Sequence, residues 1–170
     1  MKALVQRVSK GRVLVDGNPV GEIGLGYVVF LGVKQGDTEH DAKYLAEKTA
    51  ALRIFPDEND RMNRSIIETK GSALVISQFT LHADTHKGNR PSFIMAAAAE
   101  DAKRLYEFYI SSLKRILGGD RVANGIFQAK MQVEIFNDGP VTIELKSRSE
   151  LNQQPVREAP RGKRVLPCRT

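Results

Sequence analysis

The segment 77–81, with the sequence SQFTL, has the clearest potential for chemistry in this chain. It follows an unbroken apolar run at 73–76, which predicts a buried β-strand. Two hydroxyl groups and an amide therefore stand where that strand leaves the core, and the ends of rigid elements commonly present binding and catalytic groups to solvent. Hydroxyl groups at such a place suggest acyl transfer, with a Ser or Thr nucleophile as the first hypothesis.

A hydroxyl nucleophile needs a base within hydrogen-bond reach. Strand alternation would put Ser77, Phe79 and Leu81 on one side and Gln78, Thr80 and His82 on the other. A Thr80–His82 pair is then geometrically possible, whereas Ser77 has no such neighbour in the sequence. Most hydroxyls at strand ends instead satisfy nearby backbone groups, so the nucleophile is the less favoured interpretation.

The loop from His82 to Phe93 contains Lys87, Gly88 and Arg90. A short basic loop beside a glycine suits a phosphate contact, and a solvated turn explains it equally well. His82 and His86 lie four residues apart, but no Cys or carboxylate pattern accompanies them. We expect no metal site.

The segment 137–142, with the sequence NDGPVT, is the second unusual stretch. Glycine gives backbone freedom, whereas proline fixes φ and removes a donor. An X–Pro bond costs only about 0.5–1 kcal/mol to hold in the cis form. The Gly139-Pro140 pair is therefore either a plain turn between strands or a rigid turn whose carbonyl oxygens point at a ligand.

The elements that must position these segments follow from the apolar periodicity. The pattern predicts a helix that begins after Thr38, with Asp41 completing a capping box, and a second helix with an apolar stripe from Leu105 to Ile116. The predicted helices and strands cover these ranges: helices from 38 to 52 and from about 97 to 117; strands at 2–9, 11–15, 20–23, 26–33, 53–55, 73–76, 130–136 and 141–145. Strands interrupted by two helices indicate an α+β fold with an antiparallel or mixed sheet.

Length and charge divide the chain into two parts. A chain of 170 residues fits one domain. Of the net charge of +6, residues 151–170 carry +4, because they hold five basic residues and one acid. The segment 147–170 combines these charges with three prolines and few apolar residues, so we expect a disordered basic tail after a folded domain at 1–146. The first residues lack the apolar block of a signal peptide, no window suits a membrane span, and we expect a cytoplasmic protein.

Four motifs in one order resemble a known family. They are 77–81, 137–142, the N-terminal Gln6-Arg7-Val8 and the loop that holds Lys87, Arg90 and Phe93. Together they resemble the D-aminoacyl-tRNA deacylases of the widespread bacterial and eukaryotic type, over about residues 1–145. Lys130 departs from many relatives, which are acidic there, and the tail lies outside the family pattern.

The resemblance implies a homodimeric ester hydrolase with a barrel-like mixed or antiparallel sheet, two main helices and no metal or organic cofactor. It would free tRNA from D-amino acids, and from glycine, at the terminal adenosine. The residues that match the family's site are Ser77, Gln78, Phe79 and Thr80 for catalysis, Gly139 and Pro140 from the partner chain for chiral selection, and Arg7, Asn137, Val141 and Thr142 for support of that turn.

The resemblance also implies a mechanism without a protein nucleophile. Backbone N–H groups of Phe79 and Thr80 would stabilise the oxyanion while the substrate's ribose hydroxyl assists water. The partner's Gly139-Pro140 turn, with its peptide bond cis, would stand where an L side chain projects. Glycine has no side chain to clash.

Two alternatives remain open at this point. One is a deacylase of the same fold that acts on a mischarged L-aminoacyl-tRNA and holds the Gly-Pro bond trans. The other is a non-catalytic nucleic-acid-binding protein whose basic tail contacts phosphates, in a salt-dependent and sequence-independent manner.

Overall fold

The computed structural model describes residues 1–151, and the expectations about 152–170 lie outside the described residues. The strands in this part of the chain are β1 (Lys2–Val15), β2 (Asn18–Ile23), β3 (Gly26–Gly32), β4 (Arg53–Pro56), β5 (Met62–Ser65), β6 (Ser72–Ser77), β7 (Val122–Asn124) and β8 (Met131–Lys146). The helices are α1 (Glu39–Ala51), α2 (Ala99–Leu117) and α3 (Arg148–Leu151), with the 3₁₀ turns η1 (Phe79–His82) and η2 (Gly119–Arg121). None of the helices within 1–151 has the length and apolar character to cross a membrane.

The long strand β1 organises the sheet. It pairs antiparallel with β3 through its first half and with β2 through its second half, while β8 runs antiparallel along its other edge. The predicted division into strands 2–9 and 11–15, with a turn at Lys10-Gly11 between them, was wrong, because β1 continues through both residues. Gly11 serves close packing instead: a Cβ atom there would lie 2.7 Å from Cγ2 of Val28.

The sheet is mixed and curls on itself. Its strand order is β2-β1-β3-β6-β7 with β8 beside β1, and only the β3–β6 and β6–β7 pairs are parallel. The two ends of this path approach each other, since a Cβ atom on Gly21 of β2 would lie 3.0 Å from the carbonyl oxygen of Asn124 in β7. The expected α+β fold with a barrel-like sheet is confirmed. Sequence reasoning missed β5 and the short strand β7.

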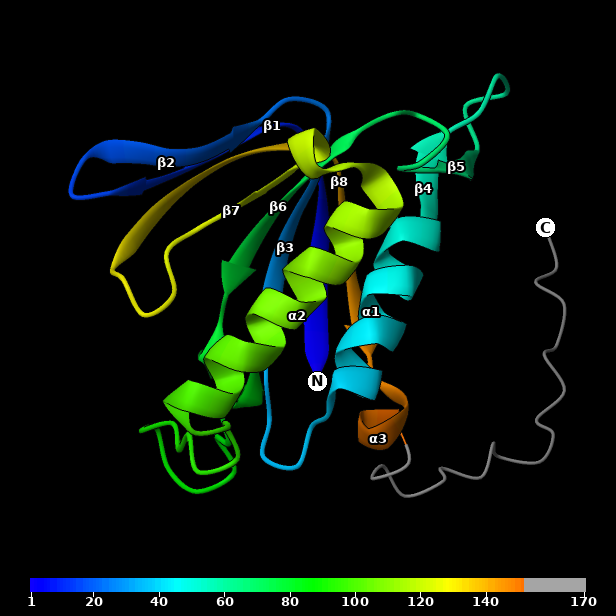
Figure 1. Ribbon diagram of the computed structural model, residues 1–170. Helices are drawn as coiled ribbons and strands as arrows, with labels where there is room; N and C mark the ends of the chain where they lie inside the picture. Colours follow the sequence, from blue (N-terminus) through cyan, green and yellow to red (C-terminus); the bar gives the residue numbers. More distant parts are fainter. Residues whose placement is uncertain (152–170) are drawn as a thin grey trace, which may run out of the picture.

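Alternating side chains of the central strands divide the core into two layers. Tyr27, Val29 and Leu31 of β3 face the helices, and Val28 faces a second cluster inside the curl with Leu74 of β6. Both faces of β3 are therefore buried, as the apolar run at 26–33 predicts. Figure 1 shows α1 and α2 together on one face of the sheet, with the β4–β5 hairpin beyond the end of α1.

Polar contacts fix where the helices begin and how they pair. The carboxylate of Asp41 accepts hydrogen bonds from the backbone N–H of Thr38, at 3.0 Å, and from its hydroxyl, at 2.9 Å. The predicted helix start is thus confirmed. The hydroxyl of Tyr109 in α2 donates to Oγ1 of Thr49 in α1, at 2.8 Å. Ile116, expected in the buried stripe of α2, is exposed, and Leu117 is buried in its place.

The sequence pattern predicts that the tail starts at residue 147, where the structure has a short packed segment. Ser147 is buried, and α3 follows it at Arg148–Leu151. Figure 1 shows α3 beside the start of α1. The segment 147–151 therefore belongs to the packed part of the chain.

Candidate active site

A cleft opens where the parallel strands β3 and β6 end at the same edge of the sheet. The strand β6 ends at Ser77, and the N–H of Gln78 still donates to the carbonyl oxygen of Leu31 in β3, at 2.8 Å. The cleft has a volume of about 600 Å³. Residues from four separate segments line it, among them Ser77, Gln78, Phe79, Phe93, Tyr106 and Phe127. The polar segment singled out from the sequence is thus part of a cleft.

The strand alternation expected beyond Ser77 was wrong, because the chain turns there into η1. Thr80 is exposed, whereas His82 is buried beneath the turn. The hydroxyl of Thr80 accepts a hydrogen bond from Nε2 of Gln78, at 2.5 Å. The Nε2 atom of His82 has no hydrogen-bond partner within residues 1–151, and burial lowers the pKa of His82. A Thr80–His82 pair is therefore not formed.

The turn η1 leaves two backbone donors unpaired beside the cleft. The first N–H groups of a helical turn have no partner inside it. In η1, the first N–H group that donates to a preceding carbonyl is that of Leu81, which donates to the carbonyl oxygen of Gln78 at 3.3 Å. Across the described part of the chain, the N–H groups of Phe79 and Thr80 donate to no protein acceptor. Two adjacent unpaired donors of this kind can stabilise a developing oxyanion.

The walls of the cleft are largely apolar and aromatic. The rings of Phe79 and Phe93 meet edge to face, with centroids 5.0 Å apart. Tyr106 lies deeper, where its hydroxyl donates to the carbonyl oxygen of Val75 at 2.9 Å, and burial raises the pKa of this phenol above its ordinary value. Tyr106 is therefore neutral and holds α2 against β6. Such walls exclude water and suit an apolar group or a planar ring.

The two basic residues proposed for phosphate contact lie outside the cleft lining. Lys87 and Arg90 are both exposed on the loop between Asp84 and Ser92, whose backbones pair through hydrogen bonds of 2.8 and 2.9 Å. The loop leads directly into Phe93 of the cleft wall. Contact with a substrate phosphate thus remains a prediction for these two side chains.

The segment 137–142 forms a bulge in β8 rather than the predicted break between two strands. Asn137 pairs with Val8, and Thr142 pairs with Gln6, so that residues 138–141 bulge opposite Arg7. The Gly139–Pro140 peptide bond is cis, and Gly139 has a φ of +126°. Thr142 also accepts a side-chain hydrogen bond from Gln6, at 3.2 Å.

Arg7 fixes the base of this bulge. Its Nε atom lies 3.1 Å from the carbonyl oxygen and 3.0 Å from Oδ2 of Asp138, and its Nη1 atom donates to the carbonyl oxygen of Ile54 at 2.5 Å. The expected role of Arg7 in supporting the turn agrees with these contacts. Sequence reasoning missed Asp138 and Ile54 as its partners. Val141 is half-buried against the helix-side core, and Asn137 is exposed.

The cleft and the bulge are far apart within one chain. Arg7 pairs with Tyr27, and Tyr27 with Ala73, so the bulge stands at the opposite end of β6 from Ser77. Three interstrand steps and four residues along β6 separate the two, a distance on the order of 20 Å. Neither Gly139 nor Pro140 lines the cleft. One chain therefore contains both halves of the predicted site, the cleft and the bulge, but does not bring them together.

Solved structures share this fold, including these two. A structure titled c-Myc DNA Unwinding Element Binding Protein has 39% sequence identity and a TM-score of 0.83, and the match covers 86% of this chain and 99% of that chain. A structure described as a probable eukaryotic D-amino acid tRNA deacylase has 17% identity and a TM-score of 0.73, over 85% of this chain and 97% of that one. The second likeness is one of fold.

Curated relatives match over nearly their whole length. The D-aminoacyl-tRNA deacylase of Heliobacterium modesticaldum is 54% identical over 148 residues, which are 87% of this chain and 97% of the relative. That of Geobacter sulfurreducens is 53% identical over 151 residues, 88% and 98% of the two chains. Fold and site thus define an ester hydrolase of the deacylase class. The family model described as D-Tyr-tRNA(Tyr) deacylase matches residues 4–146, and the chain belongs to that family.

Proposed function

We propose that this chain hydrolyses the ester bond between a D-amino acid and the terminal adenosine of tRNA, that it also releases glycine, and that it rejects L-aminoacyl-tRNA. The pair of unpaired N–H groups at Phe79 and Thr80, beside a cleft of about 600 Å³, carries this proposal. Aminoacyl-tRNA is a cytoplasmic substrate, and we assign the activity to the domain at 1–146 together with the segment 147–151 that packs on it.

The reaction needs little from protein side chains. Water attacks the ester carbonyl carbon, and the carbonyl oxygen becomes an oxyanion that accepts hydrogen bonds from the two backbone donors. The bond from carbon to the ribose oxygen then breaks, the proton from water passes to that oxygen, and free amino acid and tRNA leave. One oxyanion donor typically contributes about 10²–10³ in rate. The vicinal ribose hydroxyl of the substrate assists the attacking water.

Selection against L-amino acids is assigned to Gly139 and Pro140 of a partner chain. Their carbonyl oxygens would occupy the space into which an L side chain projects, while a D side chain points elsewhere. Support comes from the exposure of both residues, from the contacts of Arg7 at the base of the bulge, and from the distance between the bulge and the cleft of the same chain. A homodimer with two composite sites follows from this assignment.

Deacylation of matched D- and L-tyrosyl-tRNA by the purified protein tests the activity. We expect rapid release of D-tyrosine and of glycine, and no release of L-tyrosine above the uncatalysed rate. Equal rates on the two tyrosyl-tRNAs would exclude chiral selection. Faster release of an L-amino acid would favour the alternative of the same fold that acts on a mischarged L-aminoacyl-tRNA.

Mixed dimers test the composite site. A chain with Phe79→Pro lacks one oxyanion donor, because proline has no N–H, and a chain with Gly139→Ala has an altered bulge. Phe79→Pro alone should be nearly inactive, and Gly139→Ala alone should still release D-tyrosine but with a reduced D-to-L rate ratio. In a heterodimer of the two chains, isolated through two different affinity tags, the cleft that keeps both donors faces the unaltered bulge of the Phe79→Pro chain. We expect this heterodimer to have the D-to-L ratio of the wild type, whereas a ratio like that of Gly139→Ala would show that each chain completes its own site.

Nucleic-acid binding without catalysis is the second candidate, and one observation favours it. The structural relative with 39% identity is titled a DNA unwinding element binding protein. A chain that ends at Leu151 separates the two functions, because it keeps the packed segment 147–151 and removes most of the basic tail. Deacylation should survive this deletion, whereas phosphate-dominated binding by the tail, steep in salt, should be lost.

A further inference from the structure

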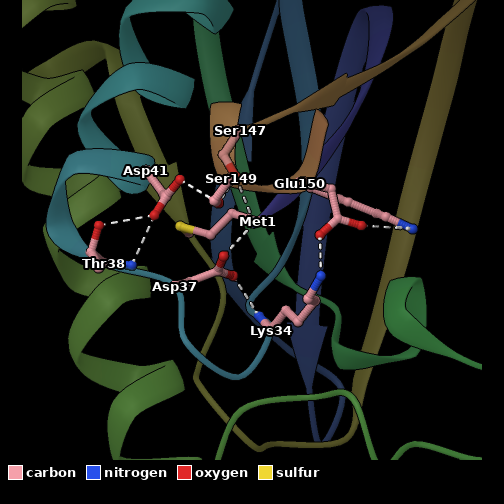
Figure 2. Close-up of polar contacts among 9 residues, drawn as sticks. Met1, Lys34, Asp37, Thr38, Asp41, Ser147, Ser149 and Glu150 are labelled. Carbon is pink, nitrogen blue, oxygen red and sulfur yellow. Dashed lines mark hydrogen bonds and ion pairs between the residues drawn. The ribbon is translucent and has the colours of Figure 1, made fainter. Parts of the chain in front are cut away.

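The last described segment closes over the N-terminus and the start of α1. The amino group of Met1 is buried, 2.7 Å from Oδ1 of Asp37 and 2.9 Å from Oγ of Ser147. Ser149 donates to Oδ1 of Asp41, at 2.6 Å. Figure 2 shows these contacts as one polar cluster between Met1, the segment 147–150 and the start of α1. The cluster anchors the segment 147–150 against the body of the protein.

Glu150 is the member of this segment that contacts two lysines. Its Oε2 atom lies 2.9 Å from Nζ of Lys34, with both side chains about nine-tenths buried; its Oε1 atom lies 3.7 Å from Nζ of Lys2. Burial alone raises the pKa of Glu150, but the hydrogen bond from Lys34 and its charge outweigh burial, and the pKa is lowered. The carboxylate is therefore ionised at neutral pH and joins two ammonium groups.

Neither lysine lines the cleft, but each contacts a segment that adjoins its lining. Nζ of Lys2 lies 3.4 Å from the carbonyl oxygen of Leu81, inside the turn η1 that presents the unpaired donors. The backbone of Lys34 forms a β-bridge with Ala96, and the neighbouring Val33 accepts a hydrogen bond from the N–H of Ala97, at 3.1 Å. Ala96 and Ala97 line the cleft. One carboxylate thus links the oxyanion turn to the segment beside α2.

We propose that Glu150 is a positioning residue of the active site, which holds η1 and the segment 94–97 at their relative positions through Lys2 and Lys34. The proposal rests on the proposed function for its catalytic consequence, but its structural part is independent of it. Misplacement of reacting groups by about 1 Å can cost about 10²-fold in rate. Loss of the link should therefore lower the catalytic rate constant and leave substrate binding nearly unchanged.

The variant Glu150→Gln tests the link, with Glu144→Gln as a matched control. Glu144 also faces Lys2, at 3.9 Å, but it is exposed, and the other ammonium group beside it is that of Lys146, at 3.3 Å, and not that of Lys34. Amide hydrogen exchange measured by NMR reports on Leu81 and Ala97, whose N–H groups are hydrogen-bonded on the two sides of the cleft. We expect Glu150→Gln to accelerate both about tenfold and to leave Val29 of the core unchanged. Glu144→Gln should change none of them.

A second variant makes the result independent of how well Glu150→Gln folds. Lys2→Met keeps the apolar stem and removes only the ammonium group, so it should accelerate exchange at Leu81 and not at Ala97. Unchanged exchange at Leu81 in this variant, or uniform acceleration through the core in Glu150→Gln, would overturn the proposal.

Deacylation kinetics give the catalytic readout. We expect Glu150→Gln to lower kcat for D-tyrosyl-tRNA about tenfold at nearly constant KM, with partial recovery in Glu150→Asp, which keeps the charge. If the wild type is active and Glu150→Gln is equally active, the positioning role is refuted and the proposed function stands. A wild-type protein without deacylase activity would refute the proposed function, and the exchange measurements would still decide whether Glu150 holds the two segments.

Discussion

Arg7 and Asp138 join β1 to the bulge of β8 through a main-chain and a side-chain contact at once. The Nε atom of Arg7 lies 3.1 Å from the carbonyl oxygen of Asp138 and 3.0 Å from its carboxylate, and Nη1 reaches the carbonyl oxygen of Ile54 in β4. A planar guanidinium can make these bonds together, whereas an ammonium group is a single point charge. The bulge therefore depends on the guanidinium geometry of Arg7 as well as on its charge.

Arg7→Lys should weaken the bulge and lower deacylation. The carbonyl oxygen of buried Ile54 would lose its charged donor, which typically costs about 1.5–3 kcal/mol in the free energy of unfolding. We expect urea denaturation to show a loss of this size and the deacylation rate to fall at least about tenfold, because the bulge would be misplaced in the composite site. Arg12→Lys on the same strand is the control: the guanidinium of Arg12 binds the partly exposed carboxylate of Glu134 and no buried carbonyl oxygen within residues 1–151, so the change should cost under about 1 kcal/mol. Equal effects of the two substitutions would contradict a specific role for Arg7.

Gly139→Ala should reduce discrimination between D- and L-aminoacyl-tRNA. A Cβ atom there would lie 2.8 Å from Cγ2 and 3.0 Å from the backbone nitrogen of Val141, at a φ of +126° that L residues rarely adopt. The bulge must shift, so we expect the D-to-L rate ratio for tyrosyl-tRNA to fall at least about tenfold and stability to fall by about 1–3 kcal/mol. Gly88→Ala is the matched control, because Gly88 has a φ of +72° and open space around it. Retained selectivity in Gly139→Ala would contradict the assigned role of the bulge.

Local patterns predicted the helices and the buried strands, because a periodicity of 2 or 3.6 residues is a property of neighbours in the sequence. They failed where a distant partner decides the conformation. Gly11 looks like a turn residue, but its missing side chain makes room for Val28. Residues 138–141 look like a turn between two strands, but pairing of Asn137 and Thr142 with β1 keeps β8 continuous.

The candidate site was predictable in its polar residues and not in its walls. The segment 77–81 stands out because polar residues follow an apolar run, and the structure puts Ser77, Gln78 and Phe79 in the cleft. Tyr106 and Phe127 carry no such signal, since an aromatic residue in a helix or loop is most often part of the core. The contacts of Glu150 depend on two lysines, Lys2 and Lys34, that are remote from it in the sequence, so no local pattern contains them.

Phe79→Pro should abolish most of the activity, because it removes one of the two proposed oxyanion donors. Residue 79 is the first of η1, a position that tolerates proline, and Gln78 before it, with φ of −144° and ψ of 83°, lies outside the helical region that a following proline disfavours. Phe79→Ala is the control, since it removes the ring and keeps the N–H. In single-turnover deacylation we expect the proline variant to be about 10²–10³-fold slower than the alanine variant. Equal rates would show that the ring, and not the amide, is what the reaction requires.

Thr80→Ala should reduce activity without abolishing it. The hydroxyl of Thr80 accepts a hydrogen bond from Gln78, and the backbone N–H survives the substitution. We expect a loss of less than about tenfold, from looser packing of η1, because a neutral side-chain hydrogen bond contributes only about 1 kcal/mol. Complete loss of activity, or an aminoacyl group trapped on the wild-type protein but not on this variant, would support a covalent mechanism instead.

The stability of the protein should fall below neutral pH through His82. Burial lowers the pKa of His82 below its ordinary value of 6.5, against the raising effects of the Gly32 backbone and of Glu150. As the pH falls below about 6.5, the unfolded chain takes up a proton at this residue before the folded chain does, so folding loses up to about 1.4 kcal/mol per pH unit until the folded pKa is passed. Urea denaturation of wild type and His82→Asn between pH 5 and pH 7.5 measures this slope. We expect the slope to decrease in His82→Asn and to persist in the control His40→Asn, because His40 is exposed on α1; an unchanged slope in His82→Asn would show that another group titrates.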